Sequence, residues 1–139
     1  MSIDNLDTVK QLIAKKECGR VEFKETTGQL ERGMETLCAF LNGEGGTVLF
    51  GVTDKGKIIG QDVSDKTRRD IAEAINRLEP MAMVQISYAP LPDSEKKVIA
   101  FHVENSKLNR PFSYKGRPYM RVESATTTMP QTAYNDLLL

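Results

Sequence analysis

The chain has 139 residues, 40% of them hydrophobic and 27% charged, and its 19 basic and 19 acidic residues cancel. This length fits one domain over residues 1–139 with a sizeable core. Zero net charge excludes a protein that is basic over its whole surface, but it allows a local basic patch. No apolar run approaches the roughly 18 residues of a membrane helix, and the acidic start MSIDNLDTVKQ is not a signal peptide. We therefore expect a cytoplasmic protein, in which Cys18 and Cys38 are free thiols.

The first part of the chain predicts a helix, a strand and a second helix. Apolar residues recur at helical spacing within residues 4–16 and alternate with polar residues within 20–24. The polar stretch 26–29 predicts a loop. Helical spacing resumes over residues 30–42 and stops at Gly43, because glycine commonly follows the end of a helix.

The most apolar strand of the chain is predicted at residues 47–52. Both alternations are apolar there, which is typical of a central strand that is covered on both faces. Asp54 ends the strand, and a tight turn leads to a short partner strand at 57–59. Gly45 and Gly46 precede it, where they allow an unusual φ or a close backbone contact. The pair is also a candidate phosphate-binding loop, although it lacks the GK[ST] ending of a P-loop.

The second half of the chain predicts mostly strands. The expected elements are a helix over 64–78, strands over 84–88 and 98–103, and a hairpin over 112–123 that turns at Lys115-Gly116. A last helix opens at 128–130, with Thr128 as its cap. Its apolar end predicts packing on the chain's own sheet, on a second copy or on a further domain. The element order predicts an α+β domain with a mixed β-sheet and helices packed on it.

Three carboxylates are candidates for a metal site. Glu17 precedes the first predicted strand, Glu22 lies within it, and Asp54 ends the central strand. If the two strands are neighbours, the three acids converge, and such oxygen ligands suit Mg²⁺ or Mn²⁺. A metal held there would activate water against a phosphodiester, with Lys24 balancing charge or holding a phosphate. The alternative is that Glu22 and Lys24 form the wet side of a strand, and that Asp54 only begins a turn.

Basic side chains gather around the predicted C-terminal hairpin, with tyrosines between them. Arginine and lysine beside aromatic rings can hold phosphates while bases stack. The alternative is an edge hairpin that its charges protect from pairing. The candidate nucleic-acid-binding residues are Lys107, Arg110, Tyr114, Lys115, Arg117 and Arg121.

Several ordered motifs resemble those of the Schlafen AlbA-like domain, over roughly residues 12–128. They are Glu17 with VEFK at 21–24, AFLN at 39–42, GGTVLFGV at 45–52, Asp54, RPF at 110–112 and GRPY at 116–119. In bacteria and archaea such domains commonly stand at the N-terminus of RecG-related transcriptional regulators. They are described as DNA-binding, and their parent proteins sometimes as ATP-binding. The resemblance implies an α+β fold, a nucleic-acid partner and further domains after Leu139.

The resemblance also implies a second activity. In animal Schlafens the matching acids form the active site of an RNA-cleaving nuclease, and carried over they are Glu17, Glu22 and Asp54. This chain has one lobe where those nucleases use two, and it lacks their Cys/His zinc cluster. We therefore favour a non-catalytic DNA-binding module of a bacterial transcriptional regulator that also forms a homodimer. The alternatives are a metal-dependent endoribonuclease, and an ATP-binding or protein-interaction module.

Overall fold

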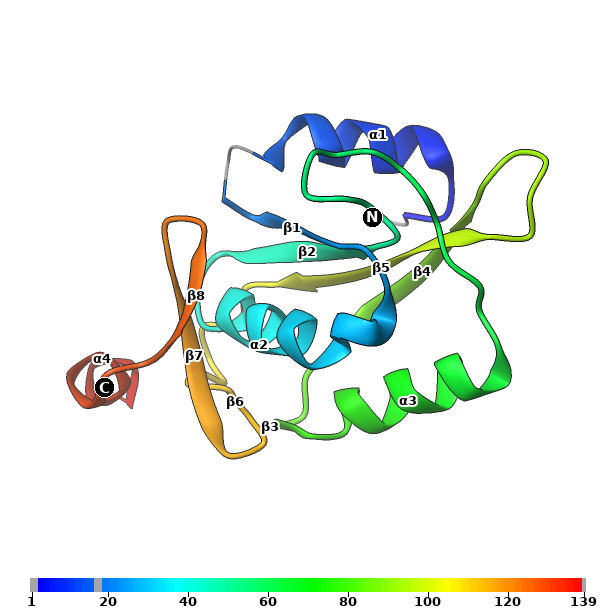
Figure 1. The fold of residues 1–139 in the computed structure, drawn as a ribbon. Coiled ribbons are helices and arrows are strands. Elements are labelled where there is room, and N and C mark those ends of the chain that lie inside the picture. The colour runs from blue at the N-terminus through cyan, green and yellow to red at the C-terminus, as the bar shows by residue number, and fades with distance from the viewer. Residues whose placement is uncertain (1–2, 17–18, 139) are drawn as a thin grey trace.

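Residues 3–16 and 19–138 are described by the computed structural model, which folds them into two four-stranded sheets and four α-helices (Figure 1). The first sheet has the order β1-β2-β5-β4. β1 and β2 are parallel, and the other neighbours are antiparallel, so the predicted mixed sheet is confirmed. The strands are β1 (Val21–Lys24), β2 (Gly45–Phe50), β4 (Gln85–Pro90) and β5 (Lys97–Glu104).

β2 is the central strand that its composition predicts. All six of its residues are buried. Val48 and Phe50 belong to the core cluster on one face of the sheet, and Leu49 belongs to the cluster on the other. β2 lies between β1 and β5, and Phe50 packs edge to face on Phe101 of β5, with ring centroids 5.0 Å apart. Apolar burial on both faces therefore fixes this strand.

Helices cover both faces of the first sheet, as predicted (Figure 1). α1 (Leu6–Ala14) packs on one face, and the other carries α2 (Leu30–Leu41) and α3 (Asp65–Ile75). A short 3₁₀ turn, η2 (Thr27–Gln29), occupies the segment that was predicted as a loop. In the described part of the chain no helix is long and apolar enough to cross a membrane.

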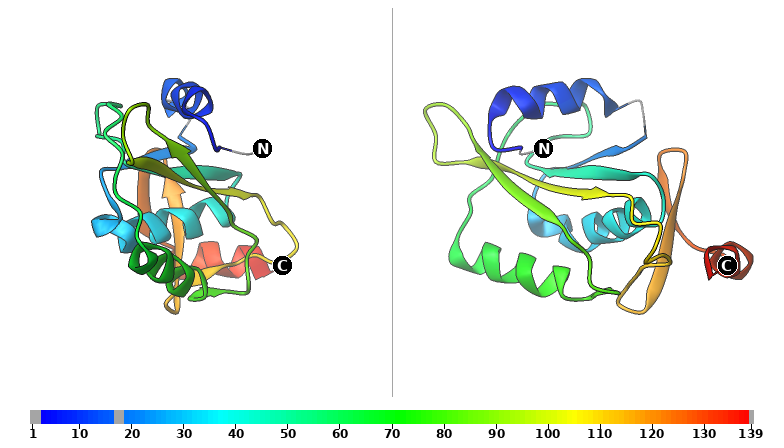
Figure 2. Two further views of the ribbon diagram at one scale, coloured as in Figure 1. Left: turned by 90° about the vertical axis from the view of Figure 1, so that its right-hand side faces the viewer. Right: turned by 180° about the vertical axis from the view of Figure 1, so that it is seen from behind.

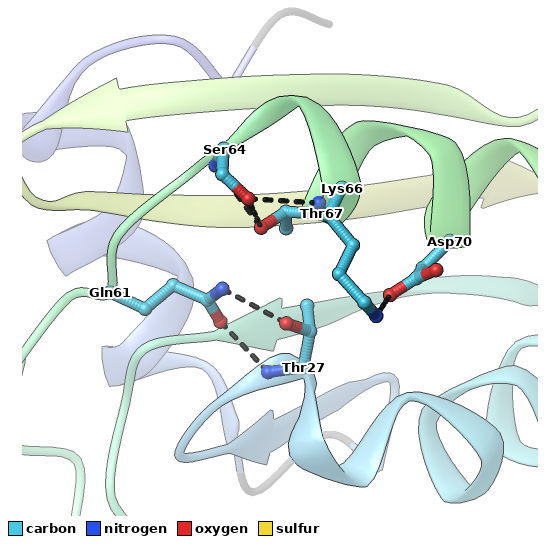
Figure 3. Close-up of polar contacts among 6 residues, drawn as sticks. All are labelled: Thr27, Gln61, Ser64, Lys66, Thr67 and Asp70. Carbon is cyan, nitrogen blue, oxygen red and sulfur yellow. Dashed lines mark hydrogen bonds and ion pairs between the residues drawn. The ribbon is translucent and has the colours of Figure 1, made fainter.

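Polar contacts fix the start of α3 (Figure 3). Ser64 and Thr67 form a capping box, in which each side chain accepts a hydrogen bond from the other's backbone N–H. The buried Gln61 reaches back to η2, where its Oε1 accepts from Thr27 N at 2.8 Å and its Nε2 donates to Thr27 Oγ1 at 3.0 Å. The Gln61 contacts hold the connection before α3 against η2, which directly precedes α2.

The second sheet is antiparallel, with the order β3-β6-β7-β8. The predicted hairpin with its turn at Lys115-Gly116 is confirmed by β6 and β7, and both turn residues have positive φ, +51° and +80°. Its strands are β3 (Leu78–Glu79), β6 (Ser113–Tyr114), β7 (Arg117–Val122) and β8 (Ala125–Thr128).

Two of these strands contain a residue that the sequence predicted as helical, Leu78 in β3 and Thr128 in β8. α3 ends at Ile75 instead of Leu78, because Leu78 pairs with Tyr114 in β3. Thr128 is not a helix cap, since it pairs with Tyr119 as the last residue of β8. α4 consequently begins three residues later and spans Gln131–Leu138. The predicted partner strand at 57–59 is reduced to a single bridge between Val52 and Ile58.

α2 lies between the two sheets, and α4 lies on the far side of the second sheet (Figures 1 and 2). The buried side chain of Asn42, which follows α2, joins that helix to the second sheet. Its Nδ2 donates to Phe112 O and to Tyr119 O, both at 2.9 Å, and its Oδ1 accepts from Phe112 N at 2.6 Å. We call this set of contacts the Asn42 joint. One turn earlier, the buried Cys38 thiol donates to Phe112 O at 3.4 Å.

Candidate functional site

Asp54 lies in a cleft of about 700 Å³ that both sheets help to form. Lys16 stands at this cleft, where its Nζ lies 4.5 Å from the centre of the Phe23 ring and donates to Asp54 O at 3.1 Å. The turn between β7 and β8 brings Glu123 to the same cleft. The cleft therefore holds two carboxylates and the cationic side chains of Lys16 and Lys55.

Glu22 points away from this cleft. Its neighbour Phe23 lines the cleft and belongs to the core cluster under α1, and successive strand residues face opposite sides of a sheet. The Glu22 carboxylate instead contacts Arg121, with Oε2 3.4 Å from Nη1, and the two side chains are only 20% and 12% exposed. By the same alternation, Lys24 shares the Glu22 side of β1.

The structure therefore brings together Glu22 and Arg121, and not Glu22 and Asp54. β1 and β2 are neighbours, as the metal-site hypothesis requires, but Asp54 turns onto the α1 side of the sheet. Glu17 lies outside the described residues. Within 3–16 and 19–138, no group of three His, Cys, Asp or Glu side chains is placed to hold a metal ion.

Gly45 and Gly46 enter β2 in close contact with other parts of the chain. Gly45 has φ +85°, and a Cβ there would lie 2.7 Å from Val103 O. A Cβ on Gly46 would lie 2.7 Å from the Phe40 ring. The glycines therefore make the close backbone contact that the sequence predicts, and the chain itself fills the space beside them.

The predicted basic hairpin divides into surface and interior residues. Lys107, Lys115 and Arg117 are exposed. Arg110 donates to Asn42 O at 3.2 Å, and Arg121 is held by Glu22 and by Thr126 Oγ1 at 3.0 Å. Tyr114 is only 2% exposed. Because its ring is buried, Tyr114 does not offer a stacking surface to a base, which corrects the role predicted for it.

The exposed part of the hairpin meets the end of α3 at a small ionic cluster. Glu31, at the start of α2, accepts hydrogen bonds from Tyr114 Oη and Lys115 Nζ, both at 2.9 Å, and its Oε1 lies 3.9 Å from Arg77 Nη1. Burial raises the pKa of Glu31, but these hydrogen bonds and the nearby positive charges outweigh burial and lower it. Burial and Glu31 together raise the pKa of Tyr114.

We call Arg77, Lys115 and Arg117 the basic corner. Arg77 follows α3, its backbone O accepts from Lys115 N at 3.2 Å, and Arg117 begins β7 after the turn. Two of these cations share one carboxylate, so the cluster keeps a positive excess. Arg77 was not among the predicted nucleic-acid-binding residues, because only the pairing of β3 with β6 brings it beside Lys115.

Fold and site together define an α+β domain with two sheets. Polar contacts, among them the Asn42 joint and the Glu22–Arg121 pair, attach the smaller second sheet to the rest of the fold. The family model described as "Schlafen, AlbA_2" matches residues 17–130, and the chain belongs to this family. Membership is consistent with a nucleic-acid-binding module.

One solved structure with the same fold is the DIP2311 protein from Corynebacterium diphtheriae. It is 19% identical, with a TM-score of 0.61, and the match covers 93% of this chain and 27% of that one. The chain thus spans about a quarter of the length of that structure. No curated protein sequence matches the chain.

Proposed function

We propose that this chain is a DNA-binding module of a bacterial transcriptional regulator and that the basic corner contacts the phosphate backbone. The convergence of Arg77 and Lys115 on the single carboxylate of Glu31 carries this proposal. Family membership and the resemblance to domains of RecG-related regulators support it, and the preference for DNA over RNA rests on that resemblance.

The geometry of the corner suits a backbone contact better than base reading. Lys115 stands in the two-residue turn between β6 and β7, the two inner strands of the second sheet. This turn lies at the end of that sheet (Figure 1). Its ammonium and the Arg117 guanidinium are exposed, whereas the adjacent Tyr114 ring is buried. Phosphate contacts of this kind position a protein on a duplex without reading its sequence. We therefore expect weak sequence preference from this chain alone.

The test compares binding of the wild type and of Lys115→Glu/Arg117→Glu to labelled duplex DNA across a range of salt concentrations. Each lost phosphate contact lowers the slope of log K against log salt by about 0.9, so the double variant should lose about 2 from this slope. The matched control is Lys10→Glu/Lys96→Glu, which makes the same charge change at exposed positions away from the corner. Circular dichroism checks that every variant is folded.

Equal affinities for the wild type and the corner variant would overturn the proposed contact surface. If the control variant lost as much affinity as the corner variant, overall charge rather than the corner would control binding. A wild type that binds neither duplex nor single strands at low salt would overturn the DNA-binding role.

A further inference from the structure

The outermost strands of the two sheets differ in how they are protected against pairing with another chain. Natural edge strands commonly carry charges or proline for this purpose. β1 contains Glu22 and Lys24, β3 contains Glu79, and β4 ends in Pro90. β8 has the sequence ATTT, with neither a charge nor a proline. Of the four outermost strands that the structure describes, β8 is therefore the one with neither a charged residue nor a proline.

The free hydrogen-bonding groups of β8 follow from its pairing with β7. Met129 N donates to Pro118 O at 2.8 Å, continuing the β7–β8 ladder beyond Thr128. In an antiparallel pair, alternate residues direct both backbone groups to the same neighbour. The backbone N–H and C=O groups of residues 125, 127 and 129 therefore point toward β7. The same groups of Thr126 and Thr128 point away from β7, toward solvent. Ala125, Thr127 and Thr128 are exposed.

We propose that β8 is a dimerisation edge that pairs antiparallel with β8 of a second copy of this chain. The outward groups specify the register, in which Thr126 of one copy pairs with Thr128 of the other and Thr127 faces Thr127. This register forms four backbone hydrogen bonds around a two-fold axis. An uncharged strand suits self-pairing, because the residue on the axis faces its own copy and a charge there would repel the same charge of the partner.

The same register brings the start of α4 close to the second copy. α4 has no buried residue in the single chain, and Leu138 is 60% exposed. Continuing the register brings Pro130, just before α4, opposite Ser124 of the other copy. Val122, the last residue of β7, lies beside that turn and is 53% exposed. The start of α4 therefore comes next to an exposed apolar side chain of the partner, which extends the interface beyond the strand edge.

The test uses opposite charges at the residue that lies on the two-fold axis. Thr127→Lys and Thr127→Glu each place like charges opposite one another, so each dimer should be weakened about five-fold or more. An equimolar mixture of the two variants should restore the dimer as a heterodimer. Sedimentation velocity of the wild type, each variant and the mixture measures this. Gln11→Lys and Gln11→Glu, on the exposed side of α1, are the matched controls and should leave the dimer unchanged.

A second pair of variants tests the backbone bonds. Thr128→Pro removes an outward N–H and should weaken the dimer, whereas Thr128→Val keeps that N–H and should not. A monomeric wild type at about 100 μM would overturn the proposal, because a dimer weaker than this has no stable interface. So would a Thr127→Lys variant that dimerises as well as the wild type, or folded Thr127 variants whose mixture stays monomeric.

Discussion

The two sheets of this domain are stabilised in different ways. In the first sheet all six residues of β2 are buried, and apolar side chains cover it on both faces. In the second sheet β7 has no fully buried residue, and directional contacts such as the Asn42 joint and the Glu22–Arg121 pair attach it to the rest of the fold. Apolar burial tolerates small shifts, but hydrogen bonds require a fixed geometry. Leu78 and Tyr114 of the second sheet share a core cluster with Phe50 of the first, so we expect the directional contacts of β7 to loosen before this shared core does.

The largest expected effect comes from the core of the first sheet. Phe50 is fully buried and packs against Phe101, so Phe50→Ala leaves a cavity and should lower the free energy of unfolding by about 3–5 kcal/mol. Urea unfolding monitored by circular dichroism measures this. Leu108→Ala, at a position that is 98% exposed, is the control and should change stability by about 0.5 kcal/mol or less. A loss near the control value would show that β2 is not the centre of the core.

An intermediate effect is expected at the Asn42 joint. Asn42→Ala leaves Phe112 N and Tyr119 O without their partner and leaves Phe112 O with only the weak Cys38 donor, which should cost about 2–3 kcal/mol. Hydrogen exchange should then quicken for amides of β6 and β7 more than for those of β2 and β5. Asn109→Ala removes an exposed amide that bonds only Ser106 and is the control. Equal acceleration of exchange in both sheets would contradict the view that the Asn42 joint stabilises the second sheet more than the first.

The smallest effect is a pH dependence at Glu31. Its pKa in the folded chain is lowered below the usual 4.5, so the stability that it contributes is present above that pH and is lost as the pH falls through the lowered folded value. Because its side chain is about half exposed, we expect less than about 1 kcal/mol.

Urea unfolding of the wild type and of Glu31→Gln tests this pH dependence. The two should differ at neutral pH and converge as the pH falls through the lowered pKa of the folded carboxylate. If the difference in the free energy of unfolding between the two chains did not change as the pH fell, ionised Glu31 would not be its source.

The sequence predicts elements well where one local pattern decides them. The apolar run of β2 and the helical spacing of α2 are such cases, and the positive φ values at Lys115-Gly116 follow from the turn chemistry of the hairpin. β8 was missed because ATTT has no apolar alternation. β3 was missed because Leu78 continues the helical spacing of α3, and only its pairing with Tyr114 makes it extended.

The site was harder to predict than the fold, because its contacts join residues that are remote in sequence. The sequence placed Glu22 and Arg121 in separate hypotheses, a metal site and a nucleic-acid surface, yet they form one ion pair across 99 positions. The position of Asp54 depends on which way the turn after β2 folds, and strand alternation does not specify that direction. Arg77 joins Lys115 only through the second sheet.

The buried cysteine at the Asn42 joint has a practical consequence. Burial raises the pKa of the Cys38 thiol to about 12, and Cys38 is fully buried where α2 meets the second sheet. A thiol reagent needs both access and thiolate, so it reacts only with molecules in which this contact has parted. In a Cys18→Ser variant, the alkylation rate of Cys38 would therefore measure how often the contact between α2 and the second sheet opens.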